Sequence, residues 1–286
     1  MTPVSSAVLL VDCPDAKGVV AAISRFLFEH GANILDAAEH RDNERRRFFM
    51  RVEFDIDGFD VAHAAFAPAF QPIADHFGMD YRVEYATDRP KTAIFVSRYE
   101  HCLVDLLYRH RTGELRCDIP LVVSNHEDAR ALAAFHGIPF HHVPVTAATK
   151  EAAEARAIAL LEAHGIELIV LARYMQVLSP AFVARYPRRI INVHHSFLPA
   201  FTGARPYHAA FDRGVKLIGA TAHYVTDVLD EGPIIEQDVA RVSHRDQIED
   251  LVAKGRDVEK VVLSRAVRWH LDHRVLVSAH KTIVFE

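Results

Sequence analysis

This sequence of 286 residues has no large excess of charge of either sign, since its formal net charge is −5 and no run of five or six like charges occurs. A nucleic-acid partner is therefore not expected, because neutralising phosphates takes a basic face. Long apolar runs are also missing: no stretch approaches the roughly 18–20 residues that a membrane-spanning helix needs. The N-terminus lacks the basic segment of a signal peptide. We therefore expect no membrane partner and a cytoplasmic location.

Cysteine is sparse as well. The three cysteines, Cys13, Cys102 and Cys117, are far apart and odd in number, which suits a reducing compartment. No Cys-x-x-Cys pair and no His-Glu-x-x-His motif of the usual zinc sites is present. A metal held by the histidines and Asp230 near one strand end stays a minor alternative, which would use His194, His195, His208 and His223. Because the chain has 19 histidines, chance clusters are expected, and we predict neither a metal nor another cofactor.

Half of the residues are apolar, and the length suits one large or two unequal domains. In the first 85 residues, short β-rich runs alternate with amphipathic helical patterns. The order is β-α-β-β-α-β, which is that of the ferredoxin-like fold. The predicted strands are 6–13, 32–40, 46–58 and 79–86, and the predicted helices are 17–31 and 60–78.

A polar, proline-containing segment at 86–91 reads as a linker, so the predicted domains are 1–86 and 92–286. In the second domain, apolar strand patterns alternate with helices, which predicts an α/β, mostly parallel, Rossmann-like sheet. The predicted strands are 92–98, 119–125, 138–145, 166–173, 189–195 and 217–225. The predicted helices are 101–111, 128–136, 149–164, 180–186 and a long region at 245–273 with a break near Gly255. The chain closes as a hairpin.

The strand at 189–195 ends in the sequence Asn-Val-His-His. Ligands of open α/β sheets bind beyond the carboxyl ends of the strands. Because strand side chains alternate between faces, Asn192 and His194 share one face, while Val193 and His195 share the other. An asparagine amide can donate to a developing oxyanion, and a histidine can move a proton or stabilise the same oxygen. Asn192 and His194 are therefore the functional candidates, and His195 is expected to pack or to bond locally.

A carboxylate for this chemistry is available in the segment 223–238. Asp227, Asp230 and Glu231 precede the Gly232-Pro233 pair directly after a predicted strand. Each of the three by itself could equally be a solvated turn residue. No serine nucleophile of the Gly-x-Ser-x-Gly type occurs.

The stretches "INVHHSFLP", "GARPYH" and "HYVTDVLDEGPI" resemble the folate-dependent formyltransferase domain. The resemblance covers nearly all of 92–286 and implies that Asn192, His194 and Asp230 are catalytic. The segment 171–183 looks like the one that holds the folate pterin in that family, which implies folate-binding roles for Met175, Gln176 and Leu178. At Gln176 the family's transferases commonly have an arginine, so that contact departs from their pattern.

The N-terminal run "DCPDAKGVVAAISRFLFEHGANI" resembles an ACT domain, a fold that commonly regulates or dimerises. An amino-acid effector and a homo-oligomer are implied. The segment "CPDAKG" lacks the Pro-Gly pair common at ligand-binding ACT sites, so no effector residues are assigned.

Transferases of this family hold the phosphate of their acceptor in a glycine-rich loop after the first strand, whereas residues 97–102 here read "SRYEHC". The resemblance therefore implies hydrolysis of the linear amide of 10-formyltetrahydrofolate to formate and tetrahydrofolate. This activity would balance one-carbon folate pools and supply formate for purine biosynthesis. In the implied mechanism Asp230 orders and helps deprotonate water, while Asn192 and a protonated His194 stabilise the oxyanion. Two alternatives remain: a formyltransferase acting on a nucleotide such as glycinamide ribonucleotide, and a non-catalytic amino-acid sensor.

Overall fold

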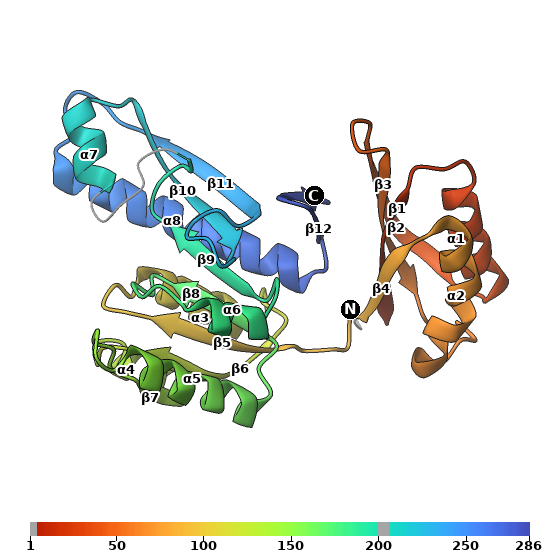
Figure 1. Cartoon of the computed structure of the whole chain (residues 1–286), viewed down its shortest axis with the longest axis horizontal. Coiled ribbons are helices and arrows are strands. Elements are labelled where there is room, and N and C mark those ends of the chain that lie inside the picture. Colours follow the sequence, from red (N-terminus) through yellow and green to blue (C-terminus); the bar gives the residue numbers. More distant parts are fainter. Residues whose placement is uncertain (1–4, 200–205) are drawn as a thin grey trace. The chain divides into compact units, whose positions relative to one another are not determined.

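The computed structural model describes residues 5–199 and 206–286 and divides the chain into two compact units (Figure 1). The first unit runs to Arg89 and also holds His273–Ser278 and Ile283–Glu286. The second unit holds Pro90–Asp272 and Ala279–Thr282. The sequence analysis grouped all of 92–286 together, whereas these two C-terminal segments pack with the first unit. Among the described residues, no helix has both the length and the apolar composition to cross a membrane.

The first unit is a four-stranded antiparallel sheet in the order β2-β3-β1-β4, with the predicted order of elements along the chain. Its elements are β1 Ser6–Pro14, α1 Val19–Glu29, β2 Asn33–Asp42, β3 Arg47–Asp55, the short 3₁₀ helix η1 His63–Ala65, α2 Phe66–Phe77 and β4 Asp80–Tyr85. The helix α2 begins late, at Phe66, and contains Pro72. The ferredoxin-like fold predicted from the hydrophobic pattern is confirmed.

The core of the first unit lies between the sheet and its two helices. Leu9, Val52 and Phe54 of the sheet pack against Phe26 of α1 and Phe66 of α2. The opposite face of the same sheet is covered by the C-terminal hairpin, made of β12 Val275–Ser278 and β13 Lys281–Val284. Both faces of the central strands β1 and β3 are therefore buried, whereas the edge strand β2 is largely exposed.

The second unit is a seven-stranded sheet in the order β11-β10-β9-β8-β5-β6-β7. The strands β5 to β9 are parallel, while β10 and β11 are antiparallel to their neighbours, so the predicted mostly parallel sheet is confirmed. The strands are β5 Lys91–Val96, β6 Asp118–Ser124, β7 Phe140–His142, β8 Leu168–Ala172, β9 Ile190–His194, β10 Leu217–Tyr224 and β11 Ile234–Arg241.

Helices cover both faces of this sheet, as the complete burial of β8 requires. The helices α5 and α6 share a hydrophobic core with β5, β6 and β8, while α8 packs along β9, β10 and β11 and against α3. The helices are α3 His101–Arg111, α4 Arg130–Phe135, α5 Lys150–His164, α6 Pro180–Arg185, α7 Pro206–Arg213 and α8 Ile248–Leu271. The carboxyl ends of β5, β8 and β9 meet at one edge.

The predicted break near Gly255 is wrong, because α8 runs through that residue without interruption. Gly255 is buried against Tyr207: a Cβ there would lie 2.2 Å from the tyrosine hydroxyl and 2.3 Å from its ring. The glycine is thus explained by a close packing contact, although glycine lowers helix stability by itself. The strand β11 and the helix α7 were not predicted.

Candidate active site

Two antiparallel strands bring Asn192 and His223 together. In the pairing of β9 with β10, Asn192 lies directly opposite His223. The Nδ2 atom of Asn192 is 3.2 Å from Nε2 of His223, and Nδ1 of His223 is 2.9 Å from the Tyr224 carbonyl oxygen. Because a carbonyl only accepts, Nδ1 of His223 carries a proton. In the neutral ring, Nε2 therefore accepts from the Asn192 amide, which fixes the orientation of that amide.

Asp230 returns from the loop after β10 to the same place. Its Oδ2 lies 3.2 Å from Nδ1 of His194, and its Oδ1 lies 3.7 Å from Nε2 of His223. Asp230 has a positive φ of 58°, and Gly232 lies so close to β10 that a Cβ would be 1.6 Å from the Tyr224 carbonyl oxygen. No other residue type fits at Gly232 without moving the backbone, so this glycine positions the loop that carries Asp230.

The electrostatics of the cluster keep Asp230 ionised. The hydrogen bond from His194 is the main cause that holds the pKa of the Asp230 carboxyl well below its usual range, against the opposing effect of burial. His194 is 7% exposed, and its Nε2 atom has no hydrogen-bond partner among the described residues. A buried, unpartnered ring nitrogen beside an anchored carboxylate is a group that a substrate or water would satisfy.

These residues line a cavity of about 350 Å³, which also includes the predicted pterin segment. Met175, Gln176 and Leu178 all contribute to its wall. Ser97 holds this segment in place, since its hydroxyl accepts from the Met175 backbone N–H at 3.0 Å and donates to Asn125 at 2.6 Å. The structure thus brings all six predicted site residues to one cavity, while their roles stay predictions.

The other candidate residues named from the sequence differ in their exposure and in their contacts with the site. Asp227 and Glu231 are exposed, and only Asp230 of the three acidic residues pairs with the histidines. His195 is buried, with its ring edge-on to His194 at 5.2 Å and to Tyr207 at 6.2 Å. Burial, then the charge of Arg173, lowers the pKa of His195 to about 4, so the ring is neutral at pH 7.

Sequence reasoning gave no site role to Arg173 or Glu259, and it considered His223 only as a possible metal ligand. His223 had a signal, because it is the histidine of the "HYVTDVLD" match, seven positions before Asp230. Arg173 had only its place at the end of a predicted strand. Glu259 lies in a helix whose charged residues are mostly solvated, so nothing local marked it as buried. The predicted "GARPYH" match falls partly on residues 200–205, which lie outside the described residues.

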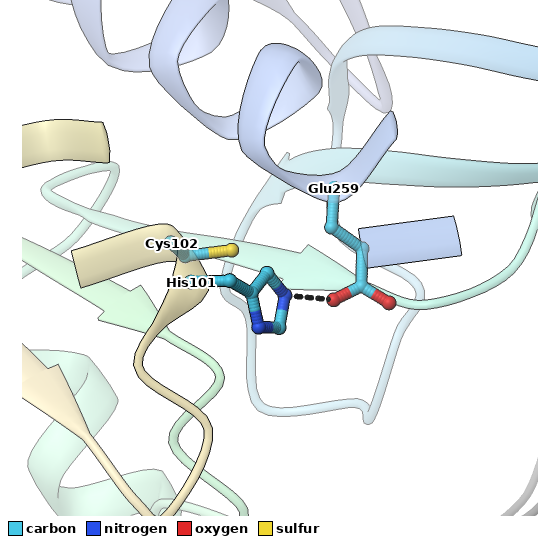
Figure 2. A group of neighbouring side chains, drawn as sticks. All are labelled: His101, Cys102 and Glu259. Carbon is cyan, nitrogen blue, oxygen red and sulfur yellow. Dashed lines mark hydrogen bonds and ion pairs between the residues drawn. The ribbon is translucent and has the colours of Figure 1, made fainter. Parts of the chain in front are cut away.

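One further cluster could in principle hold a metal. Among the described residues, His101, Cys102 and Glu259 form a group of potential ligands, with ligand atoms within 4.8 Å of one another (Figure 2). However, burial raises the pKa of Cys102 well above its usual value, so its thiol is protonated. Glu259 also has Arg173 at 3.3 Å, and a neighbouring guanidinium disfavours a divalent cation. The donor set fits a hydrogen-bonded cluster better than a metal site.

Two family models match the chain: formyl transferase over residues 90–267 and ACT domain over residues 7–64. A formyltetrahydrofolate deformylase from Synechocystis is 50% identical over 98% of both chains. The crystal structure of a formyltetrahydrofolate deformylase from Pseudomonas syringae pv. tomato has a TM-score of 0.97 at 50% identity, covering 100% of this chain and 96% of that one. A glycinamide ribonucleotide transformylase from Symbiobacterium toebii is more distant, with a TM-score of 0.66 at 29% identity over 71% of this chain and 97% of that one.

Proposed function

The chain belongs to the formyltetrahydrofolate deformylase family, and we propose that it hydrolyses 10-formyltetrahydrofolate to formate and tetrahydrofolate through Asn192, His194 and Asp230. The observation that carries the assignment of these residues is the unpartnered Nε2 of His194. It belongs to a ring anchored by Asp230 and lines the same cavity as Asn192 and the pterin segment. Such a nitrogen can accept a proton from water while the water attacks a formyl group.

Asn192 is proposed to stabilise the tetrahedral intermediate. One N–H of its amide is directed to His223, and the other remains for the oxygen that gains negative charge when water attacks. His223 acts as a positioning residue, since its protonated Nδ1 makes Nε2 the acceptor of the amide. Loss of one such donor to an oxyanion typically lowers the rate by about 10²–10³-fold.

His194 is proposed to move the proton. A carboxylate whose pKa lies well below its usual range is a weak base, so Asp230 is poorly suited to take a proton from water. Its proposed role is to orient His194 and the attacking water. The neutral His194 would take a proton from water on Nε2 while the new C–O bond forms. Asp230 would stabilise the resulting imidazolium, as in the Ser-His-Asp triad. The proton would then pass to N10 as the C–N10 bond breaks. In the sequence interpretation, Asp230 helped to deprotonate water and His194 was already protonated.

The pterin is proposed to bind along Met175, Gln176 and Leu178. Met175 is half exposed, and its backbone N–H is already bonded to Ser97, so the carbonyls and side chains of this segment are available. The cavity of about 350 Å³ lies within the usual size range for small-molecule sites. We propose that no metal or other cofactor takes part, because Asn192, His194 and Asp230 together supply an oxyanion donor and a proton carrier in the cavity.

The loop after β5 supports hydrolysis over transfer. Tyr99 lies beneath the guanidinium groups of Arg173 at 5.4 Å and Arg256 at 5.7 Å, and His101 is bonded to Glu259. A loop occupied in this way lacks the open glycine-rich backbone that cradles a phosphate. The proposed role is control of one-carbon folate pools and supply of formate for purine biosynthesis. An amino-acid effector at the ACT domain, a homo-oligomer and a cytoplasmic location stay predictions.

The test is incubation of the full chain with 10-formyltetrahydrofolate alone, followed by measurement of formate and tetrahydrofolate in equal amounts. A second reaction contains glycinamide ribonucleotide at millimolar concentration. We expect the same rate of formate release and no formylated ribonucleotide. Formylated ribonucleotide would favour the transferase alternative, and no release of formate in either reaction would favour the non-catalytic sensor.

A further inference from the structure

Arg173 is a buried cation in the wall of the candidate active site. It follows β8 directly, is 8% exposed and lines the same cavity as Asn192 and His194. Its φ of 62° is uncommon for a residue with a long side chain. A buried charge held in an unusual backbone conformation calls for a partner or a function.

The nearest anion, Glu259, is already satisfied by other donors. Its Oε1 accepts the Tyr207 hydroxyl at 2.5 Å, and its Oε2 is paired with Nε2 of His101 at 2.7 Å (Figure 2). Arg173 approaches the same Oε2 with Nε at 3.3 Å. That contact is an ion pair without hydrogen-bond geometry, because Nε of Arg173 has no hydrogen-bond partner among the described residues.

The guanidinium of Arg173 therefore keeps donor capacity inside the cavity. Its flat face packs over the ring of Tyr99, which leaves the edge, where the N–H groups lie, for another acceptor. His194 contributes a second unpartnered buried nitrogen to the same cavity. The neighbouring His195 ring is in edge contact with His194 and is neutral, so it adds no competing charge at pH 7. The unsatisfied guanidinium of Arg173 therefore forms a site for a small anion, whereas Nε2 of the neutral His194 ring is an acceptor and serves water instead.

We propose that Arg173 is the binding residue for the formate that the reaction releases. This inference rests on the proposed function, which generates formate in this cavity. Formate is ionised at neutral pH like other carboxylates, and its two oxygens match the fork of a guanidinium. Glu259 holds the guanidinium in place without using its hydrogen bonds.

The experiment uses the full chain and sodium formate as the probe. Binding is followed by line broadening of ¹³C-labelled formate and, separately, by formate inhibition of hydrolysis. We expect Arg173→Gln to weaken formate affinity about tenfold or more, the effect of roughly one lost charge-assisted pair. Glu259→Gln should instead tighten formate binding, because it removes the competing anion. Arg98→Gln alters an exposed arginine of the loop after β5 and should change neither measurement.

Unchanged formate affinity in Arg173→Gln would overturn the proposal, and so would equal displacement of formate by chloride, which cannot use a bidentate fork. If Arg173→Gln fails to fold, Arg173→Lys keeps the charge and removes the fork; an affinity equal to that of the unmodified chain would then also overturn it. Failure of the proposed function has a different signature, namely no release of formate from 10-formyltetrahydrofolate by the unmodified chain. If the unmodified chain releases formate but Arg173→Gln binds formate equally well, only this inference is rejected.

Discussion

Nδ1 of His194 lies 3.2 Å from Oδ2 of Asp230, although the two residues come from the end of β9 and from the loop after β10. Because β10 runs antiparallel to β9, it ends opposite Ile191, and the loop after it must turn back to bring Asp230 to His194. Gly232 then lets the loop fold back against Tyr224.

Replacing Asp230 by asparagine should abolish most turnover and leave the fold intact. The amide has nearly the same shape, but it does not stabilise an imidazolium on His194. The corresponding change in the Ser-His-Asp triad lowers kcat by about 10⁴-fold, and we expect a loss of about 10³-fold or more. The measurement is the steady-state rate of formate release, with circular dichroism as the check on folding. A rate within a few-fold of the unmodified chain would contradict the mechanism.

Gly232→Ala should displace Asp230 without touching it chemically. A Cβ at this position would lie 1.6 Å from the Tyr224 carbonyl oxygen, so the backbone of the loop must move. We expect a loss of activity of about 10²-fold, since a displacement near 1 Å at a catalytic group has an effect of that size. The matched control is Glu231→Ala, which changes an exposed neighbour and should retain activity. Equal activity in both variants would show that Gly232 does not set the position of Asp230.

His195 should make the stability of the second unit depend on pH. Its pKa is about 4 in the folded chain, lowered chiefly by burial and then by Arg173 and His194, against an ordinary value of 6.5. Below pH 6.5 the unfolded chain therefore binds a proton that the folded chain does not. Unfolding becomes easier as the pH falls from 6.5 to 4, and the loss at pH 5 relative to pH 7 is about 2 kcal/mol.

His195→Gln should flatten this dependence. The measurement is the urea unfolding free energy at pH 7 and pH 5, followed by the fluorescence of Trp269, the single tryptophan, which lies on α8. His208→Gln, at an exposed position on α7, is the control and should keep the full dependence. An unchanged difference between the two pH values in His195→Gln would mean that His195 is accessible to protons in the folded chain.

Removal of metal should leave hydrolysis unaffected. The one group of three potential ligands among the described residues is His101, Cys102 and Glu259, and it is occupied by its own hydrogen bonds and by Arg173. Dialysis against a chelator, with the metal content measured before and after, should preserve the rate of formate release. Loss of activity that added zinc restores would show that a metal takes part.

Local sequence patterns were enough to predict the type of both folds and the edge of the sheet that carries the site. They also revealed the likeness of Asn192, His194 and Asp230 to the formyltransferase motif. Alternation along one strand was enough to separate His194 from His195. These features depend on residues close together in the chain, where the periods of strand and helix act directly on the pattern.

Which distant residues meet depends on the three-dimensional packing of the chain. The pairing of Asn192 with His223, the burial of Glu259 between His101 and Tyr207, and the placement of Arg173 in the cavity wall depend on strand order and helix packing. Gly255 looked like a helix break for the same reason, because the tyrosine ring that requires it lies in another helix. Local propensity costs a fraction of a kilocalorie per residue, whereas burial of a side chain and satisfaction of its polar groups are worth several times more. Long-range packing therefore sets the final contacts of the site.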